Sequence, residues 1–111
     1  MKKILVGVPT YDGMKYCQDK FLERIKQFSY PNYDILIIDN SKGEEYFNEL
    51  SKICDVKVVK DDTIEDKNIL RLISSRNKIL EYGLEKGHDY ILMLDADVIP
   101  PKDVLEELLG C

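Results

Sequence analysis

The sequence has one histidine, no tryptophan and only three cysteines. His88 precedes a predicted strand and is expected in a surface turn, so no Ser-His-Asp site can be argued from it. Cys17, Cys54 and Cys111 are odd in number and widely spaced, which fits neither a zinc site nor a disulfide framework. This use of cysteine favours a reducing compartment.

Glycine-rich phosphate loops are also missing. The first predicted strand is followed by Gly7-Val8-Pro9-Thr10-Tyr11-Asp12-Gly13, which is neither the dinucleotide fingerprint nor a Gly-Lys-Ser/Thr loop. Classical NAD binding and P-loop chemistry are therefore disfavoured. No apolar run approaches the length of a membrane span, and no signal-peptide pattern opens the chain. We therefore expect a cytoplasmic protein without a transmembrane segment, either free or held at a membrane face through a partner.

Positive charge is in the minority, with 16 Lys and Arg against 21 Asp and Glu and a net charge of −5. Nonspecific nucleic-acid binding is therefore not expected. An acidic protein that binds a diphosphate needs a local cation, which a metal or a well-placed arginine could supply. Most of the acidic stretch 60–66 is expected to be a solvated connector.

The 111 residues form one predicted domain, residues 1–111, in which strands and helices alternate four times. Apolar runs without alternation, such as Tyr90 to Leu94, predict strands buried on both faces of a mostly parallel sheet. The pattern predicts an α/β fold with a four-stranded sheet and helices on both faces. The predicted strands are 3–8, 34–38, 56–59 and 90–94, and the predicted helices are 14–28, 43–53, 67–84 and 102–109.

Polar residues follow three of these strands directly, as Thr10-Tyr11, Asp39-Asn40 and Asp95-Ala96-Asp97. Parallel strands end at the same edge of a sheet, which is where α/β sheets bind ligands. An Asp-x-Asp pattern alone is weak, because about one is expected by chance in this composition. Two carboxylates about 5 Å apart repel by roughly 3 kcal/mol at an effective dielectric constant of about 20. A divalent cation, hydrogen-bond donors or a retained proton would relieve the repulsion, and oxygen ligands suit Mg²⁺ or Mn²⁺.

The predicted helix 67–84 carries one irregularity. Ile69, Ile73, Leu80 and Leu84 share a face at helical spacing, and Arg76 falls in the middle of it. Such an arginine either extends its charged end out to solvent or is held inward by an anion. An inward Arg76 would require a carboxylate or phosphate nearby.

Four segments together resemble the family 2 glycosyltransferases of the GT-A fold, and the resemblance covers nearly the whole chain. It implies a Rossmann-like sheet of GT-A type with the first and fourth strands side by side. It also implies that residues 1–111 are the nucleotide-sugar-binding half, with the C-terminal acceptor-binding half and its general base absent. The four segments are Val8-Pro9-Thr10-Tyr11, Ile37-Ile38-Asp39-Asn40-Ser41, Ser75-Arg76-Asn77-Lys78 and Leu94-Asp95-Ala96-Asp97.

The resemblance also implies a set of substrate-binding residues at the strand ends and on the third helix. Those residues are Pro9, Thr10, Tyr11, Asp39, Asn40, Arg76, Asp95, Ala96 and Asp97.

Individual roles follow from the same resemblance. Pro9, Thr10 and Tyr11 would line the base and ribose pocket, with Tyr11 against the base. Asp39 would accept a hydrogen bond from uracil, and Arg76 would lie inward near the nucleotide.

In the same family, the acidic pair belongs to the metal and the ribose. Asp95 would contact the ribose or metal-bound water, and Asp97 would bind the Mn²⁺ or Mg²⁺ that bridges the donor diphosphate. These two aspartates form the expected metal site.

The expected function is binding of a nucleotide-diphosphate sugar, with UDP-sugar favoured, for metal-assisted transfer to an acceptor that the sequence does not identify. Turnover is less firmly implied than binding, because the general base is not found in this chain. A non-catalytic, truncated α/β module that binds a nucleotide or a protein is the alternative. A phosphoryl-transfer or signalling domain ranks behind both, since such folds usually place the key acid directly after the first strand. A truncated sheet should also expose an apolar edge or flank, which predicts self-association.

Overall fold

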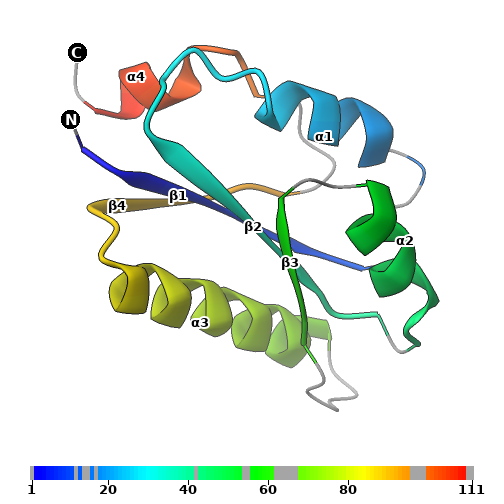
Figure 1. Cartoon of the computed structure of the whole chain (residues 1–111). Coiled ribbons are helices and arrows are strands. Elements are labelled where there is room, and N and C mark those ends of the chain that lie inside the picture. Colours follow the sequence, from blue (N-terminus) through cyan, green and yellow to red (C-terminus); the bar gives the residue numbers. More distant parts are fainter. Residues whose placement is uncertain are drawn as a thin grey trace.

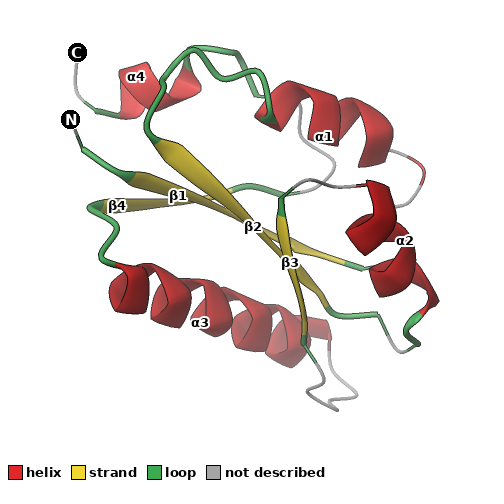
Figure 2. Ribbon diagram, viewed as in Figure 1, coloured by secondary structure: helices red, strands yellow, loops and turns green. Residues whose placement is uncertain are grey.

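Strands and helices alternate along the whole chain, as the sequence predicts (Figures 1 and 2). The computed structural model describes residues 2–11, 13, 16, 18–41, 43–53, 56–61, 68–95 and 100–109. None of the helices in these ranges combines the length and apolar composition that a membrane span requires. In chain order the elements are β1 (Ile4–Thr10), α1 (Gln18–Ile25), β2 (Tyr33–Asp39), α2 (Glu45–Ile53), β3 (Lys57–Lys60), α3 (Asn68–Lys86), β4 (Tyr90–Met93) and α4 (Val104–Leu108).

The four described strands form one parallel sheet in the order β3-β2-β1-β4. The α/β class, the parallel pairing and the position of the first strand beside the fourth are therefore confirmed. In the register, Thr10 lies opposite Asp39, and Asp39 lies opposite Lys60. This register brings the ends of β1, β2 and β3 to the same edge of the sheet.

The helices cover both faces of the sheet, since side chains alternate along each strand (Figure 1). Val6 and Val8 point into the core beneath α1, α2 and α4, whereas Leu5 points toward α3. The α3 side has a smaller buried cluster, built on Ile79 of the helix.

Helix α3 packs very close to β1 and β4 because a glycine lies at each contact. Gly7 of β1 faces the helix, and Gly83 of the helix faces β4. A Cβ built on Gly7 would lie 2.3 Å from Cγ2 of Ile79, and one built on Gly83 would lie 2.5 Å from Cδ1 of Ile91. Both distances are too short for real carbon contacts, so these two glycines set the distance between the helix and the sheet.

The face of α3 that packs on the sheet differs from the predicted one. Ser75, Ile79 and Gly83 are buried, whereas Ile73 is 48% exposed and Leu84 is 78% exposed. Apolar periodicity indicated the wrong face, because close packing against Gly7 and Ile91 selects the narrow face of small residues around Ile79. Leu80 is exposed with the other apolar residues, and the side chain of Ile69 lies outside the described residues.

Strand β4 is an outer strand of the described sheet, and it is less buried than the predicted strand covered on both faces. It pairs with β1 on one side within the described sheet, and Tyr90 is 51% exposed. Ile91, Leu92 and Met93 are half-buried. An unbroken apolar run therefore marks an outer strand here, and its exposed apolar surface agrees with the expected open flank.

His88 is not the surface turn residue that the sequence suggested, because its side chain is only 1% exposed. Its Nε2 lies 2.9 Å from Oδ2 of Asp34, and Lys3 Nζ lies 3.4 Å from the same oxygen. Burial by itself raises the pKa of the Asp34 carboxyl, but the contacts with His88 and Lys3 outweigh it and hold that pKa below its usual value. This group ties the start of β2 to the turn before β4.

Candidate functional site

The carboxyl edge of the sheet gathers residues from β1, β2 and β3 in one row. Thr10, Asp39 and Lys60 are neighbours in the register, so their side chains point to the same face of the sheet. Thr10 and Asp39 are both buried. The predicted convergence of the first two polar clusters is thus seen in the structure.

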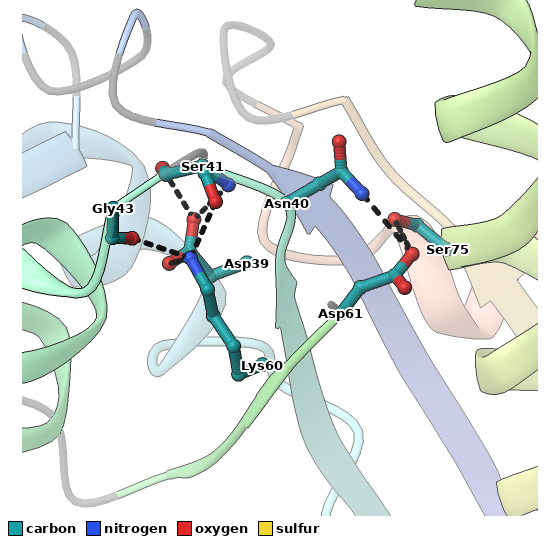
Figure 3. A network of polar contacts seen from close by, with 7 residues as sticks. All are labelled: Asp39, Asn40, Ser41, Gly43, Lys60, Asp61 and Ser75. Carbon is teal, nitrogen blue, oxygen red and sulfur yellow. Dashed lines mark hydrogen bonds and ion pairs between the residues drawn. The ribbon is translucent and has the colours of Figure 1, made fainter. Parts of the chain in front are cut away.

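Asp39 is the buried centre of an ionic cluster, which we call the Asp39–Lys60 cluster and define as Asp39, Ser41, Gly43 and Lys60 (Figure 3). Oδ1 of Asp39 accepts hydrogen bonds from the backbone N–H of Ser41, at 3.0 Å, and from its hydroxyl, at 2.6 Å. Lys60 Nζ lies 3.2 Å from Oδ2 of Asp39. The same ammonium donates to the carbonyl oxygens of Ser41 and Gly43, at 2.5 and 2.6 Å.

Charge balance explains this cluster. The Asp39 side chain is fully buried, and a buried carboxylate needs a cation and several donors to offset its lost hydration. Lys60 supplies the charge, and its three N–H groups match the three acceptors that surround it. The pairing fastens the turn after β2 to the end of β3.

A second polar cluster lies on the opposite face of the same edge, beside α3 (Figure 3). The next residue of each strand points the other way, so Asn40 and Asp61 face Ser75 of the helix. Oδ2 of Asp61 accepts from the Asn40 amide at 3.2 Å and from the Ser75 hydroxyl at 2.9 Å. Ser74 adds a contact to Oδ1 at 3.3 Å. This cluster fixes the first half of α3 against the strand ends.

The sequence did not identify Lys60, Asp61 or Ser75 as site residues. Lys60 and Asp61 fall within the stretch 60–66, most of which the sequence predicts to be a solvated connector; Asp61 is an exception, since it is 2% exposed. The remaining residues of that stretch, 62–66, lie outside the described residues. The signal that would have found the pair is the sheet register, which sets Lys60 opposite Asp39.

The end of β1 and the residue that follows it carry a buried hydroxyl, on Thr10, and an exposed ring, on Tyr11. Oγ1 of Thr10 is buried and has no hydrogen-bond partner among the described residues, although the Thr10 carbonyl accepts from Asn40 N at 2.9 Å. Tyr11 is 45% exposed, and its ring lies against Gly13, where a Cβ would be 2.3 Å from Cε2. Pro9 is half-buried within β1. A buried hydroxyl without a protein partner is uncommon, and it suits a hydrogen bond to a bound ligand.

The acidic pair after β4 is described only in part. Leu94 N donates to the Gly7 carbonyl at 3.0 Å, which continues the β1–β4 pairing and places the exposed Asp95 close to the edge. Ala96 and Asp97 lie outside the described residues. Among the described residues, no group of three or more His, Cys, Asp or Glu side chains could hold a metal ion.

Arg76 is exposed, so the prediction of an inward guanidinium is wrong for this structure. Its neighbour Ser75 occupies the buried position and contacts Asp61. The buried face of α3 is set by Ser75, Ile79 and Gly83, which turns Arg76 outward to solvent. Of the two alternatives for this arginine, the solvent-directed one is observed, and a contact between Arg76 and a nucleotide stays a prediction.

The parallel sheet and its polar carboxyl edge define an α/β domain of the class that binds ligands where its strands end. The family model described as "Glycosyltransferase like family 2" matches residues 3–111. The chain therefore belongs to the family 2 glycosyltransferase-like proteins. A search of curated proteins finds no match to the chain.

Solved structures of S. aureus TarS share the fold. The chain superposes on TarS with a TM-score of 0.64 at 16% identity, covering 97% of this chain and 19% of TarS. TarS 1–349 in complex with UDP and in complex with UDP-GlcNAc both give a TM-score of 0.62 at 17% identity over 97% of this chain. These matches cover 31% and 30% of those TarS chains, so the present chain spans less than a third of the proteins that it resembles.

Proposed function

We propose that this chain binds the nucleotide diphosphate of a sugar donor, with UDP-sugar the preferred class, for transfer of the sugar to an acceptor. Membership in the family 2 glycosyltransferase-like proteins supports the proposal. The TarS structures that contain UDP and UDP-GlcNAc support the choice of uridine diphosphate. The proposed site is the carboxyl edge of the sheet, formed by Thr10, Tyr11, Asp39 and Asn40, together with Asp95.

The observation that carries the proposal is the Thr10 hydroxyl, which is buried beside Asp39 and has no hydrogen-bond partner among the residues that the structure describes. A buried hydroxyl without a partner lowers the stability of the free protein, so it is best explained by a ligand that completes its hydrogen bond. Tyr11, the residue after Thr10, has an exposed ring that lies against Gly13. This ring offers an aromatic surface on which a base could stack. Pro9 and Arg76 stay in the predicted site on the family resemblance.

Asp95 and Asp97 would hold Mn²⁺ or Mg²⁺. The exposed carboxylate of Asp95 at a strand end fits such an ion, because Mg²⁺ is usually bound by one or two carboxylates together with substrate phosphates. The metal, when bound, would offset the charge that builds on the leaving diphosphate. The protein residues themselves would bind and orient the nucleotide at the edge.

Transfer requires an acceptor site and a base that deprotonates the acceptor hydroxyl. We propose that these belong to further polypeptide, since the TarS chains extend well beyond the matched region. The cytoplasmic location stays a prediction from the sequence. Self-association is proposed to occur through a second copy on the exposed flank of β4 and α3, because β4 is the outer strand of the described sheet and an outer strand is a template for pairing.

Isothermal titration calorimetry of the 111-residue chain with UDP, with and without Mn²⁺, tests this function. We expect UDP to bind, and we expect chelation of the metal or Asp95→Asn to weaken binding about tenfold or more. Asp103→Asn is the matched control, since Asp103 is exposed and makes no side-chain capping bond at the start of α4. Equal affinity with metal and with chelator would refute the metal role, and no binding of UDP or UDP-GlcNAc would refute the nucleotide site.

A further inference from the structure

Helix α3 lies by itself on one face of the sheet in the described part of the chain, while α1, α2 and α4 cover the other face (Figure 1). The side of α3 that packs on the sheet is formed by Ser75, Ile79 and Gly83. At about 100° per residue, the opposite side of the helix carries a row of exposed apolar residues. These residues are Leu70, Ile73, Leu80 and Leu84. A continuous apolar row of this kind on a surface marks an interaction site.

The spacing of this row is that of a coiled coil. Its members lie three, four, three and four residues apart once the exposed Asn77 is included, in the order Leu70, Ile73, Asn77, Leu80 and Leu84. They therefore occupy positions a, d, a, d and a of the heptad repeat, which form the seam along which two helices pack. A single asparagine at an a position specifies the register and the oligomeric state of such a pair. The seam thus carries its own signal for a defined partner helix.

The charges beside this seam match those of a second copy in parallel orientation. Arg76 is at the g position of the first heptad and Glu81 is at the e position of the second, and both are exposed. In a parallel pair, a g residue of one helix meets the e residue of the next heptad in the other helix. Arg76 of each copy would therefore face Glu81 of the other, twice by symmetry. In an antiparallel pair g faces g and e faces e, so like charges would meet.

We propose that α3 pairs with α3 of a second copy of this chain through a parallel two-stranded seam formed by these heptad positions. The pairing rests on the self-association proposed above, to which it gives a defined interface, and it does not depend on the nucleotide site. A helix that is already folded against the sheet loses little further backbone entropy when it pairs. Because the seam spans only about two heptads, we expect a weak dimer with a dissociation constant above about 1 µM.

Sedimentation equilibrium of the 111-residue chain at several concentrations, without nucleotide, tests the proposal. We expect a monomer–dimer equilibrium that Leu80→Gln weakens at least about tenfold, because a d residue is lost from both copies. Glu81→Arg should weaken dimerisation about threefold or more, since it sets a like charge against Arg76. Adding Arg76→Glu reverses the second charge and should restore most of the wild-type affinity. Glu85→Arg is the matched control, because it makes the same charge change at an exposed position outside the seam.

A dimer that Glu81→Arg weakens and the added Arg76→Glu restores supports the proposal, because a parallel seam brings these two positions together. A wild type that stays monomeric, or a dimer that Leu80→Gln leaves unchanged, overturns the proposal. A dimer whose loss in Glu81→Arg is not restored by the second charge reversal overturns the parallel pairing. Circular dichroism establishes that each variant is folded.

Asn77→Ile gives a second readout that does not depend on weakening the protein. Removal of the polar a residue should tighten association and admit oligomers larger than the dimer, and an unchanged equilibrium would overturn the seam. Titration with UDP is a separate measurement on the same chain. Failure to associate therefore leaves nucleotide binding intact, and failure to bind UDP leaves the interface intact.

Discussion

Replacing Thr10 by valine should stabilise the free protein and weaken its binding of UDP. The threonine hydroxyl is buried at the end of β1 without a hydrogen-bond partner among the described residues. Valine has nearly the same shape and is well suited to a strand. The change therefore removes an unsatisfied polar group and leaves the packing of the strand in place.

The size of both effects follows from that geometry. An unsatisfied buried hydroxyl costs about 1–3 kcal/mol, so Thr10→Val should raise the free energy of unfolding by up to that amount. With a urea m-value of about 2 kcal/mol/M, the midpoint of unfolding should rise by about 0.5–1.5 M. Loss of a hydrogen bond to the ligand is worth about 0.5–1.5 kcal/mol, which weakens UDP binding about two- to tenfold.

Urea unfolding followed by circular dichroism measures the first effect, and calorimetric titration with UDP measures the second. Thr10→Ser is the paired control, because it keeps the hydroxyl and removes the methyl group. It should lose about 1 kcal/mol of stability and retain UDP binding. A Thr10→Val protein that is about 1 kcal/mol less stable than the wild type would refute the reasoning, because the hydroxyl would then have a partner in the free protein.

Three further predictions concern packing, pH and association. Gly7→Ala should lose about 1–3 kcal/mol in urea unfolding, because its Cβ would lie 2.3 Å from Ile79, whereas Gly43→Ala, with no atom within 4 Å, should change stability by less than about 0.5 kcal/mol. The free energy of unfolding should fall as the pH drops below 3.8, the usual pKa of an aspartate, and then through the lowered pKa of Asp34. Asp34→Asn should make stability less dependent on pH in this range. Light scattering at high concentration should detect self-association that Leu84→Lys reduces, and a wild type that stays monomeric would argue against the exposed flank as an interface.

The fold was readable from the sequence because each element has a strong local signal. Buried strands appear as runs such as Ile4 to Val8, and parallel order follows from helices that alternate with strands. The face of α3 that packs on the sheet could not be predicted in this way. Periodicity selected Ile73, Leu80 and Leu84, but the packed face of α3 is defined by close contacts with Gly7 and with Ile91. Such contacts depend on partners distant in the sequence.

Some residues of the candidate site could likewise be predicted from the sequence, and others could not. The position of Thr10 and Asp39 at one edge could be predicted from the sequence, because each lies just beyond a predicted strand and parallel strands end at one edge. Lys60 and Asp61 could not, because only the register of β3 shows that they face Asp39 and Asn40. Charge-rich connectors look solvated in sequence until the pairing of the strands is known.

The sequence by itself determined the class of protein, since apolar runs, their spacing and the polar residues after them depend on local chain chemistry. Only the tertiary structure decided how those polar residues are used. It buries Asp39 under Lys60 and Ser41, leaves the Thr10 hydroxyl without a partner among the described residues, and turns Arg76 to solvent. The physical reason is that burial and hydrogen bonding at the sheet edge depend on strand register and helix packing, which join residues far apart in the chain.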